Sequence, residues 1–419
     1  MRKLFCLVAA TGAIAFAATL AQPASGQSSS APAATPPPAA AAPAPLPTPS
    51  VTGPLQWLPP ATFSSGFLGK VSANGIVTGS GVWTGNHVAG DKVGQAALSN
   101  GQIFLQKADG PVQYFIQVGA YTMPALGTPF LATDKTISDL YGPVPVAFLK
   151  IPVGKTTSVQ IGSLPTLIGA EYTFTFENMN VNRGLLWNQE NAVNRGIQLN
   201  QALGKYFSAS VSWNDGFYSN RYSWITGSLA YTKGPHSLSF VGGGNLGQTV
   251  FQTVATPIQN NSSIYNVIYT YTKGAWIVQP YWQFTHVPAN AKVGVLKATN
   301  TDGGAVLVSR AFRHGFSLPA RFEYISNSGS ASAIAYPAGS ETGVNPYANL
   351  LYGQGSNALS GTLTPTYQTG GFYIRGDLSW VHAGNYTPGS AFGPSGINPN
   401  QPRAMAEIGF IFGNNLTER

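Results

Sequence analysis

Short turns and long connections alternate without a break along most of this sequence, and this alternation limits the possible folds more than any other feature. Each short turn contains glycine, and the turns are 108–110, 153–155, 203–205, 233–235, 273–274, 313–315 and 369–371. The connections between them are longer, as at 248–262 and 327–356. A barrel inserted from the periplasm has short turns at one rim and longer loops at the other. A soluble sandwich has no reason to keep that alternation.

The segments between the turns alternate apolar and polar residues with a period of two, which is the pattern of β-strands. In 371–382, Phe372 and Leu378 fall on one face of a strand, and Arg375 and Asp377 fall on the other. The same pattern recurs in 112–118, 207–213, 265–271, 276–284, 316–324, 359–367 and 406–412. One strand alone could cover a soluble core or face lipid, and the order of the turns favours lipid.

Counting back from the last segment predicts 16 antiparallel strands. They are 74–85, 96–107, 111–122, 145–152, 156–163, 194–203, 205–215, 221–232, 236–247, 263–272, 275–286, 304–313, 315–326, 357–368, 371–383 and 403–412. The fold class is therefore all-β, a transmembrane antiparallel barrel. Because the strand count is even, the first strand starts and the last strand ends at the periplasmic rim. A barrel of this size encloses an aqueous channel rather than a packed core.

The start of the chain has the features of an export signal. Residues 1–26 combine a positive beginning with an apolar stretch, and cleavage could follow Ala21 or Gly26. Residues 27–53 are almost all Ala, Pro, Ser, Thr and Gln, which predicts a disordered linker. The barrel then occupies 54–419, and export places it in the outer membrane.

Composition excludes several classes of function. The only cysteine, Cys6, lies in the signal, so the exported chain has no disulfide and no cysteine-ligated metal. Two of the 22 basic residues lie there too, which leaves 20 against 14 acidic residues, a balance near +6. The basic residues are scattered along the sequence, so we expect no nucleic-acid binding. The positive balance weakly favours anions as solutes.

No catalytic or cofactor motif has its required context. Gly242, Gly244 and Gly247 match the dinucleotide-binding spacing, but a polar loop and another strand follow instead of a helix. The five histidines have no metal-ligand spacing, and no Gly-x-Ser-x-Gly occurs. We therefore expect no cofactor, no metal and no enzyme, although serines are too numerous for the sequence to exclude a hydrolytic site.

Charges on the polar side of the strands are the first candidates for a functional role. A charge facing lipid costs about 2–4 kcal/mol at the membrane midplane, so these side chains should face the lumen. They are Arg321, Glu323, Arg375, Asp377 and Glu407. They could form ion pairs that stiffen the barrel, or they could select solutes directly.

The connection 164–193 is the most charged part of the first half of the chain. It contains Glu171, Glu177, Arg183 and Glu190, and Arg195 lies just beyond. One hypothesis is that this segment folds into the pore and constricts it; the alternative is an extracellular loop. Aromatic residues near strand ends suit interfacial girdles. These are Tyr222, Trp224, Tyr231, Tyr271, Trp276 and Trp380.

Several stretches resemble a known family. The segments are Ala147–Lys150, Val159–Glu171, Asn178–Trp187, Asn194–Gln198, Thr362–Tyr367 and Phe372–Arg375. Together they resemble the β-barrel porin-2, OmpL-like family of Gram-negative bacteria, with Ser163 where a lysine is common. The resemblance implies an outer-membrane barrel with porin activity and no defined solute.

These observations predict an outer-membrane porin that lets small hydrophilic solutes or ions diffuse passively through a water-filled barrel. The alternative is a structural or adhesive barrel whose contact surface is formed by loops 327–356 and 384–402. The expected partners are outer-membrane lipid, the solutes, the barrel assembly machinery and periplasmic chaperones during export, and two further copies in a homotrimer.

Overall fold

A computed structural model of the chain describes residues 55–66, 69–249, 257–293, 295, 297–328 and 350–414. The predicted signal peptide and the linker 27–53 lie outside the described residues. In the described part, no helix is both long enough and apolar enough to cross a membrane.

Strands account for most of the described residues, as the period-two alternation predicts. They are β1 (Ala61–Ser65), β2 (Gly69–Thr84), β3 (Gly94–Lys107), β4 (Gln113–Tyr121), β5 (Val146–Val153), β6 (Thr157–Pro165), β7 (Val193–Leu203), β8 (Phe207–Asn214), β9 (Trp224–Lys233), β10 (His236–Asn245), β11 (Ser263–Lys273), β12 (Trp276–Val287), β13 (Thr299–Ala311), β14 (Phe316–Asn327), β15 (Asn357–Leu363), β16 (Thr366–Thr369), β17 (Phe372–Gly384) and β18 (Asn400–Phe412). The described helical segments are short and lie in the connections. They are α1 (Thr133–Thr136), η2 (Ile137–Tyr141), η3 (Thr175–Glu177), η4 (Leu186–Gln189), α2 (Pro257–Asn260) and η5 (Ala291–Val293).

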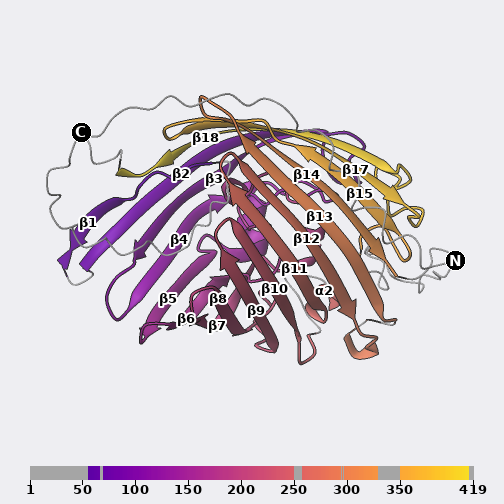
Figure 1. Cartoon of the computed structure of the whole chain (residues 1–419). Helices are drawn as coiled ribbons and strands as arrows, with labels where there is room; N and C mark the ends of the chain where they lie inside the picture. Colours follow the sequence, from indigo (N-terminus) through magenta and orange to yellow (C-terminus); the bar gives the residue numbers. More distant parts are fainter. Residues whose placement is uncertain are drawn as a thin grey trace, which may run out of the picture. The chain divides into compact units, whose positions relative to one another are not determined.

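The strands from β2 onward close into a barrel in which neighbouring strands pair antiparallel (Figure 1). The ring is closed by β18 against β2, with Phe412 opposite Gly75 and Arg403 opposite Thr84. Of the 18 strands, β1 lies outside this ring, and β15 and β16 share one place between β14 and β17. The ring therefore has 16 places, which confirms the predicted fold class.

Two details of the wall were not predicted. One predicted strand, 357–368, is split into β15 and β16 at Thr364 and Pro365, because proline has no N–H for the ladder. The short strand β1 pairs with the first residues of β2, from Ala61 opposite Ala73 to Ser65 opposite Gly69. It covers the part of β2 that lies beyond the last residue of β18.

The two faces of the wall differ as the alternation predicts. The outer face carries large apolar side chains, for example Phe322 at 56 % exposed and Leu378 at 58 %. The alternate residues of the same strands face inward and are mostly polar, such as Arg375, which is fully buried. Five of the six predicted girdle residues lie on the outer side or at its edge. Trp224 does not: it faces inward, is fully buried, and its indole N–H donates to the Asn260 carbonyl at 3.0 Å.

All seven predicted short turns lie at the rim where β2 starts and β18 ends, and we call this the short-turn rim. The longer connections lie at the opposite rim, the loop rim. The connection 122–145 contains α1 and η2, which were not predicted. Its helical segment occupies the gap that opens beyond the short β4–β5 pairing, which extends only from Gln113 to Gln117 on β4.

Candidate functional site

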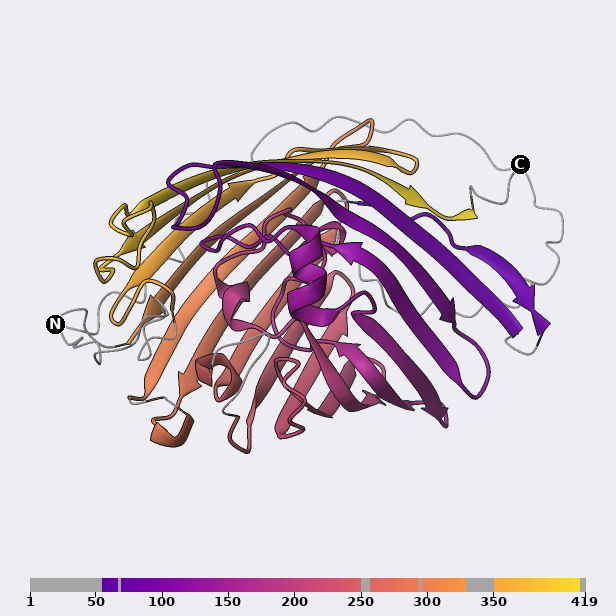
Figure 2. The same cartoon turned by 180° about the vertical axis from the view of Figure 1, so that it is seen from behind.

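The connection between β6 and β7, residues 166–192, folds back inside the ring of strands (Figure 2). It contains η3 and η4, and most of its side chains are buried. Glu171, Glu177, Arg183 and Glu190 are each at most 5 % exposed. The four charged residues that the sequence singled out here therefore lie in the interior of the barrel, and we call this connection the inner loop.

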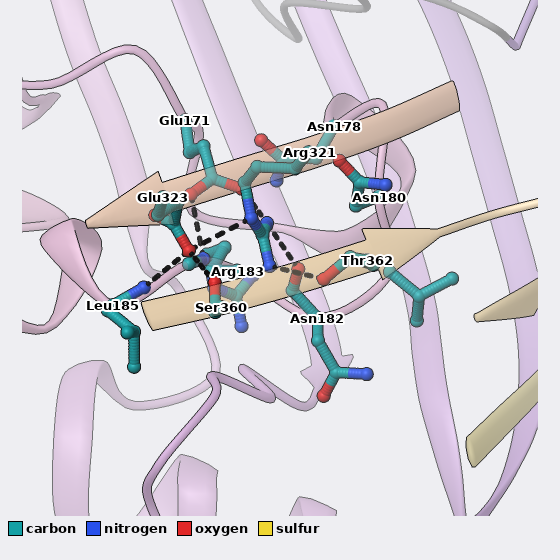
Figure 3. Close-up of polar contacts among 12 residues, drawn as sticks. Glu171, Asn178, Asn180, Asn182, Arg183, Leu185, Arg321, Glu323, Ser360 and Thr362 are labelled. Atoms are coloured by element: carbon teal, nitrogen blue, oxygen red, sulfur yellow. Dashed lines mark hydrogen bonds and ion pairs between the residues drawn. The ribbon is translucent and has the colours of Figure 1, made fainter. Parts of the chain in front are cut away.

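One polar contact between the inner loop and the wall is centred on Arg321 of β14 (Figure 3). Its Nη1 donates to Glu171 Oε1 at 2.6 Å and to the Asn182 carbonyl at 2.7 Å. Its Nη2 donates to Thr362 Oγ1 at 3.1 Å, and its Nε lies 3.2 Å from Glu323 Oε2. One buried guanidinium therefore joins a loop carboxylate to a wall carboxylate.

Both of these carboxylates also accept backbone hydrogen bonds from the inner loop. Glu323 Oε2 accepts from the Leu185 N–H at 3.0 Å and from Ser360 Oγ at 2.6 Å. Glu171 Oε2 accepts from the Gly184 N–H at 2.7 Å. A Cβ at Gly184 would lie 1.9 Å from Glu323 Oε1, so a larger residue here would displace the Glu323 carboxylate.

A second contact joins the inner loop to β17 and β18. Arg375 and Glu407 face each other across the two strands, with Arg375 Nη2 3.0 Å from Glu407 Oε2. Arg375 donates to the carbonyls of Asn178 and Thr175, both at 3.0 Å. The Thr175 hydroxyl in turn donates to Glu407 Oε1 at 2.6 Å. The wall pair is therefore completed by the loop.

Asp377, two residues further along β17, holds the loop by its backbone N–H groups. Its Oδ2 accepts from Val181 N at 2.8 Å and from Asn182 N at 3.2 Å. Its Oδ1 accepts from Asn182 Nδ2 at 2.9 Å and from Ser379 Oγ at 2.6 Å. Asp377 therefore fixes the inner loop at Val181 and Asn182.

Arg403 of β18 is an interior charge that the sequence analysis missed. It donates to the carbonyls of Ala125 at 2.8 Å and Thr128 at 2.6 Å, both in the connection 122–145. That connection also binds the inner loop, because the N–H of Leu126 donates to the Arg183 carbonyl at 2.9 Å. Arg403 lies in phase with Glu407, so the alternation that identified Glu407 could have found it.

Two of the predicted residues stabilise the inner loop from within. Glu177 Oε2 accepts from the Phe174 N–H at 3.0 Å and so closes η3. Arg183 donates to the Thr173 carbonyl, and its guanidinium lies 4.5 Å from the centre of the Trp187 ring. Neither side chain is exposed to the lumen.

Glu190 is the exception among the interior acids, because neither carboxylate oxygen accepts a hydrogen bond of normal geometry from a described residue. Burial, followed by the charges of Glu171 and Glu323, raises its pKa well above the ordinary range, and the Tyr281 hydroxyl beside it compensates only in part. Gly169 lets this carboxylate approach, since a Cβ there would lie 1.7 Å from Glu190 Oε2. Of the interior charges, this one costs stability when ionised.

Apolar contacts complete the packing of the inner loop on the opposite side. Ile168 and Leu186 belong to one buried cluster with the inward-facing Tyr281, Leu307 and Ile325 of β12, β13 and β14. The loop is therefore held by charges toward β14, β17 and β18 and by apolar contacts toward β10–β14.

The segment just before β1 also enters this interior. The Trp57 ring stacks on Phe176 of η3 at 5.6 Å and meets Phe104 edge-on at 5.4 Å. The Gln368 side chain binds both the N–H and the carbonyl of Gln56, at 2.6 and 2.7 Å. Residues 55–58 thus support the inner loop from the short-turn rim.

The inner face of β6–β13 has a different character, because none of its inward-facing residues in the described strands is charged. Hydroxyl and amide groups form hydrogen-bonded rows there, apart from the apolar residues of β10–β13 that pack against the inner loop. Gln198 Nε2 donates to Asn200 Oδ1 at 2.7 Å, and Ser210 Oγ donates to the same oxygen at 2.8 Å. Toward the short-turn rim, side chains such as Ser228 and Ser239 are half-buried and open to the lumen.

Arg195 does not join the interior charges that the sequence analysis grouped it with. It alternates with the inward-facing Asn194 and Gly196 and so lies on the outer register of β7, beside Ile197. Its Nη2 lies 2.8 Å from Asp215 Oδ2, and its guanidinium lies 3.9 Å from the Tyr218 ring. The charge is neutralised at the loop rim, because Asp215 is fully buried beside it.

A family model for "Putative beta-barrel porin-2, OmpL-like" matches residues 70–412. No curated protein matches this chain in sequence. Solved structures that share the fold include an anion-selective porin from Comamonas acidovorans, with 13 % identity, TM-score 0.55, and coverage of 82 % of this chain and 99 % of that one.

Two further structures show the same fold. A loop-deletion mutant of OmpT, an outer membrane protein of Vibrio cholerae, has 14 % identity and TM-score 0.52 over 82 % of this chain and 99 % of that one. The outer membrane channel DcaP of Acinetobacter baumannii has 9 % identity and TM-score 0.50 over 84 % of this chain and 100 % of that one. At these identities the likeness concerns the fold, and the family model carries the assignment. The chain belongs to the β-barrel porin-2, OmpL-like family of outer-membrane porins.

Proposed function

We propose that this porin lets small hydrophilic solutes diffuse passively through a water-filled lumen, and that the inner loop sets the narrowest part of the path. The observation that supports this proposal most is the fixed position of the loop inside the ring. Arg321, Arg375 and Asp377 bind its backbone from the wall. A loop held in this way narrows the lumen without closing the barrel at its rims.

The interior charges act in this proposal by positioning the loop rather than by contacting solutes. Arg321, Glu323, Arg375, Asp377 and Glu407 are each at most 2 % exposed. Side chains this deeply buried have little surface for a passing ion. Of the two roles that the sequence left open, burial favours ion pairs that stiffen the barrel.

The solute path then follows those uncharged inner residues of β6–β13 that the inner loop leaves uncovered, such as Ser228 and Ser239. A wall of hydroxyl and amide groups offers both donors and acceptors and does not concentrate ions of one sign. We therefore expect weak ion selectivity, in spite of the positive balance of the chain. A reversal potential close to zero in a salt gradient supports this, and a strong preference for either sign contradicts it.

Single-channel recording in planar bilayers tests the proposal. Folded protein should give discrete conductance steps, and deletion of residues 171–190 should enlarge them, provided that the variant retains the heat-modifiable mobility of a folded barrel. If well-folded wild-type protein gives no steps, passive diffusion is wrong.

A closed structural barrel is the second candidate, and one observation favours it. Toward the loop rim, inward side chains such as Thr226, Asn266 and Gln283 are buried by the connections that fill this half of the lumen. The same recordings separate the candidates, because a closed barrel gives no steps. The homotrimer and the assembly partners remain predictions, and light scattering of the purified protein tests the first of them.

A further inference from the structure

The short-turn rim gathers basic residues that are far apart in the sequence. Five successive turns, from the one after β5 to the one after β13, each carry at least one basic residue at the turn or at the adjoining strand end. All of these side chains are exposed, and they are Lys155, Lys205, Lys233, Lys273, Arg310 and Arg313. Neighbouring turns are two strands apart, which is about 10 Å along the rim. The fold therefore makes a regular basic row, which we call the basic rim, out of residues that the sequence shows as scattered.

The basic rim is not neutralised by the protein. Its five turns contain no Asp or Glu, and its six side chains make no ion pair with any described residue. Among the described residues, the acid at this rim is Asp109, in the turn after β3, and it is paired with Lys107. The hydrogen bond from Lys107 lowers the pKa of Asp109, so this acid is already paired with its own lysine.

The loop rim shows that this imbalance is not a general property of the molecule. Its charges are mixed in sign: exposed Asp134 lies beside exposed Lys135, and half-buried Asp91 lies beside exposed Lys92. Arg195 is paired with Asp215. The two rims therefore face different surroundings.

The three basic side chains that lie in strands, Lys233, Lys273 and Arg310, are on the outer register of the wall. Lys273, Trp276 and Arg310 lie side by side on the outer register of β11, β12 and β13. The Arg310 guanidinium lies 5.1 Å from the centre of the Trp276 ring. Trp276 is 43 % exposed and belongs to the aromatic girdle, which marks the level of the lipid headgroups.

A second aromatic ring repeats the arrangement at the next part of the rim. The ammonium groups of Lys205 and Lys233 lie 5.2 and 5.5 Å from the centre of the Tyr206 ring. Aromatic faces hold such cations at the interface while their polar ends stay in the headgroup layer. The positive charges are thus held at the depth where lipid phosphates lie.

We propose that the basic rim binds the phosphate groups of anionic phospholipids in the periplasmic leaflet of the outer membrane. The charge row, its outward direction and its aromatic neighbours all fit a layer of negative headgroups, and the mixed charges of the loop rim do not. Anionic lipid at one rim would fix the depth of the barrel in the membrane. This proposal rests on the outer-membrane location and not on channel activity.

Native mass spectrometry of the full chain, extracted from vesicles of phosphatidylcholine with about one third phosphatidylglycerol, tests the proposal. Wild-type protein should retain phosphatidylglycerol over phosphatidylcholine, and the variant K205Q/K233Q/K273Q/R310Q should lose most of that enrichment. The matched control K92Q/K135Q/R221Q/K292Q removes the same number of charges from the loop rim and should keep it. Heat-modifiable mobility shows that both variants are folded.

Raising the salt concentration before extraction should reduce phosphatidylglycerol retention by wild-type protein, so the proposal is testable even if the variant does not fold. Equal retention of the two lipids by wild-type protein, or equal losses in both variants, overturns the proposal. Binding of soluble anionic cell-wall fragments without lipid enrichment also overturns it, because the rim would then recognise a polymer.

Discussion

Interior charges and rim charges follow opposite rules in this molecule. Inside the ring, Arg321 and Arg375 are fully or almost fully buried and bound to carboxylates and to backbone carbonyls. At the short-turn rim, Lys233, Lys273 and Arg313 are exposed and have no acidic partner among the described residues. The first group holds the protein to itself, and the second group is available to bind its surroundings.

The difference follows from the cost of burying charge. Burying a guanidinium is costly unless nearby acceptors compensate for the lost water. Arg321 and Arg375 each donate to a backbone carbonyl of the inner loop and each lie beside a carboxylate. A lysine at the interface keeps water or lipid phosphate as its partner and needs no acid nearby. The net positive charge of the chain therefore lies mainly at the short-turn rim, away from the inner loop and from the solute path.

The largest expected effect comes from removing one interior arginine. Arg375→Ala leaves Glu407 buried without its partner and should lower the free energy of unfolding by about 3–5 kcal/mol. Arg313→Ala, at the rim, should change it by less than about 0.5 kcal/mol. Urea unfolding of the folded protein in micelles measures both, and similar losses for the two variants would remove the distinction between the groups.

A new charge should separate the two faces of the wall. Leu229 lies on the outer face of β9, and its neighbour Ser228 is half-buried on the inner face. Leu229→Arg should cost about 2–4 kcal/mol and impair assembly, whereas Ser228→Arg should assemble and shift the channel toward anions. The corresponding pair at Leu378 and Ser379 is a poorer test, because Ser379 is buried against Asp377. The fraction of each variant that folds into a heat-modifiable barrel is measured. Equal fractions for the two variants would contradict the assignment of Leu229 to the outer face and Ser228 to the inner face.

Glu190 sharpens the comparison because it is an interior charge without a matched partner. In the folded protein its pKa is raised above that in the unfolded chain, so ionisation opposes folding as the pH rises through the unfolded value. Glu190→Gln should therefore gain about 1 kcal/mol at neutral pH and nothing below about pH 4. Thermal unfolding at both pH values measures this gain. A loss of stability at neutral pH would mean that Glu190 has an ionic partner.

The smallest effect is expected at the rim. Lys273→Gln should leave the unfolding free energy within about 0.5 kcal/mol of wild type, while it reduces retention of phosphatidylglycerol. A clear loss of stability in lipid-free micelles would show that Lys273 belongs with the interior charges after all.

Much of the wall could be predicted from the sequence, because alternation with a period of two is local and each turn has its own signal. That is how the 16 places and the inward side of Arg375 and Glu407 were found. The break at Pro365 was missed because the apolar alternation continues across it. Trp224 was misplaced because a large aromatic residue near a strand end suits either a girdle or an interior cluster, and its contact with Asn260 is not local.

The interior was predicted only in part. The charges of residues 164–193 stood out because the chain has so few. The partner of Glu171 is Arg321, which is 150 residues away in the sequence, and the wall acid Glu407 binds Thr175 over 232 residues. Arg195 follows that charged segment in the sequence, but its register on β7 places it on the outer face of the wall. The basic rim was missed for the same reason, since its residues come together only when the barrel closes.

The position of the inner loop is the central claim, and a disulfide tests it most directly. The exported chain has no cysteine if the signal is removed, and the side chains of Asn180 and Thr364 are in contact, with Nδ2 2.8 Å from Oγ1. In folded protein, the variant N180C/T364C should form a disulfide under mild oxidation, seen as a mobility shift that reductant reverses. If both thiols instead stay free and react with a bulky water-soluble reagent, the loop does not lie against the wall and the account is wrong.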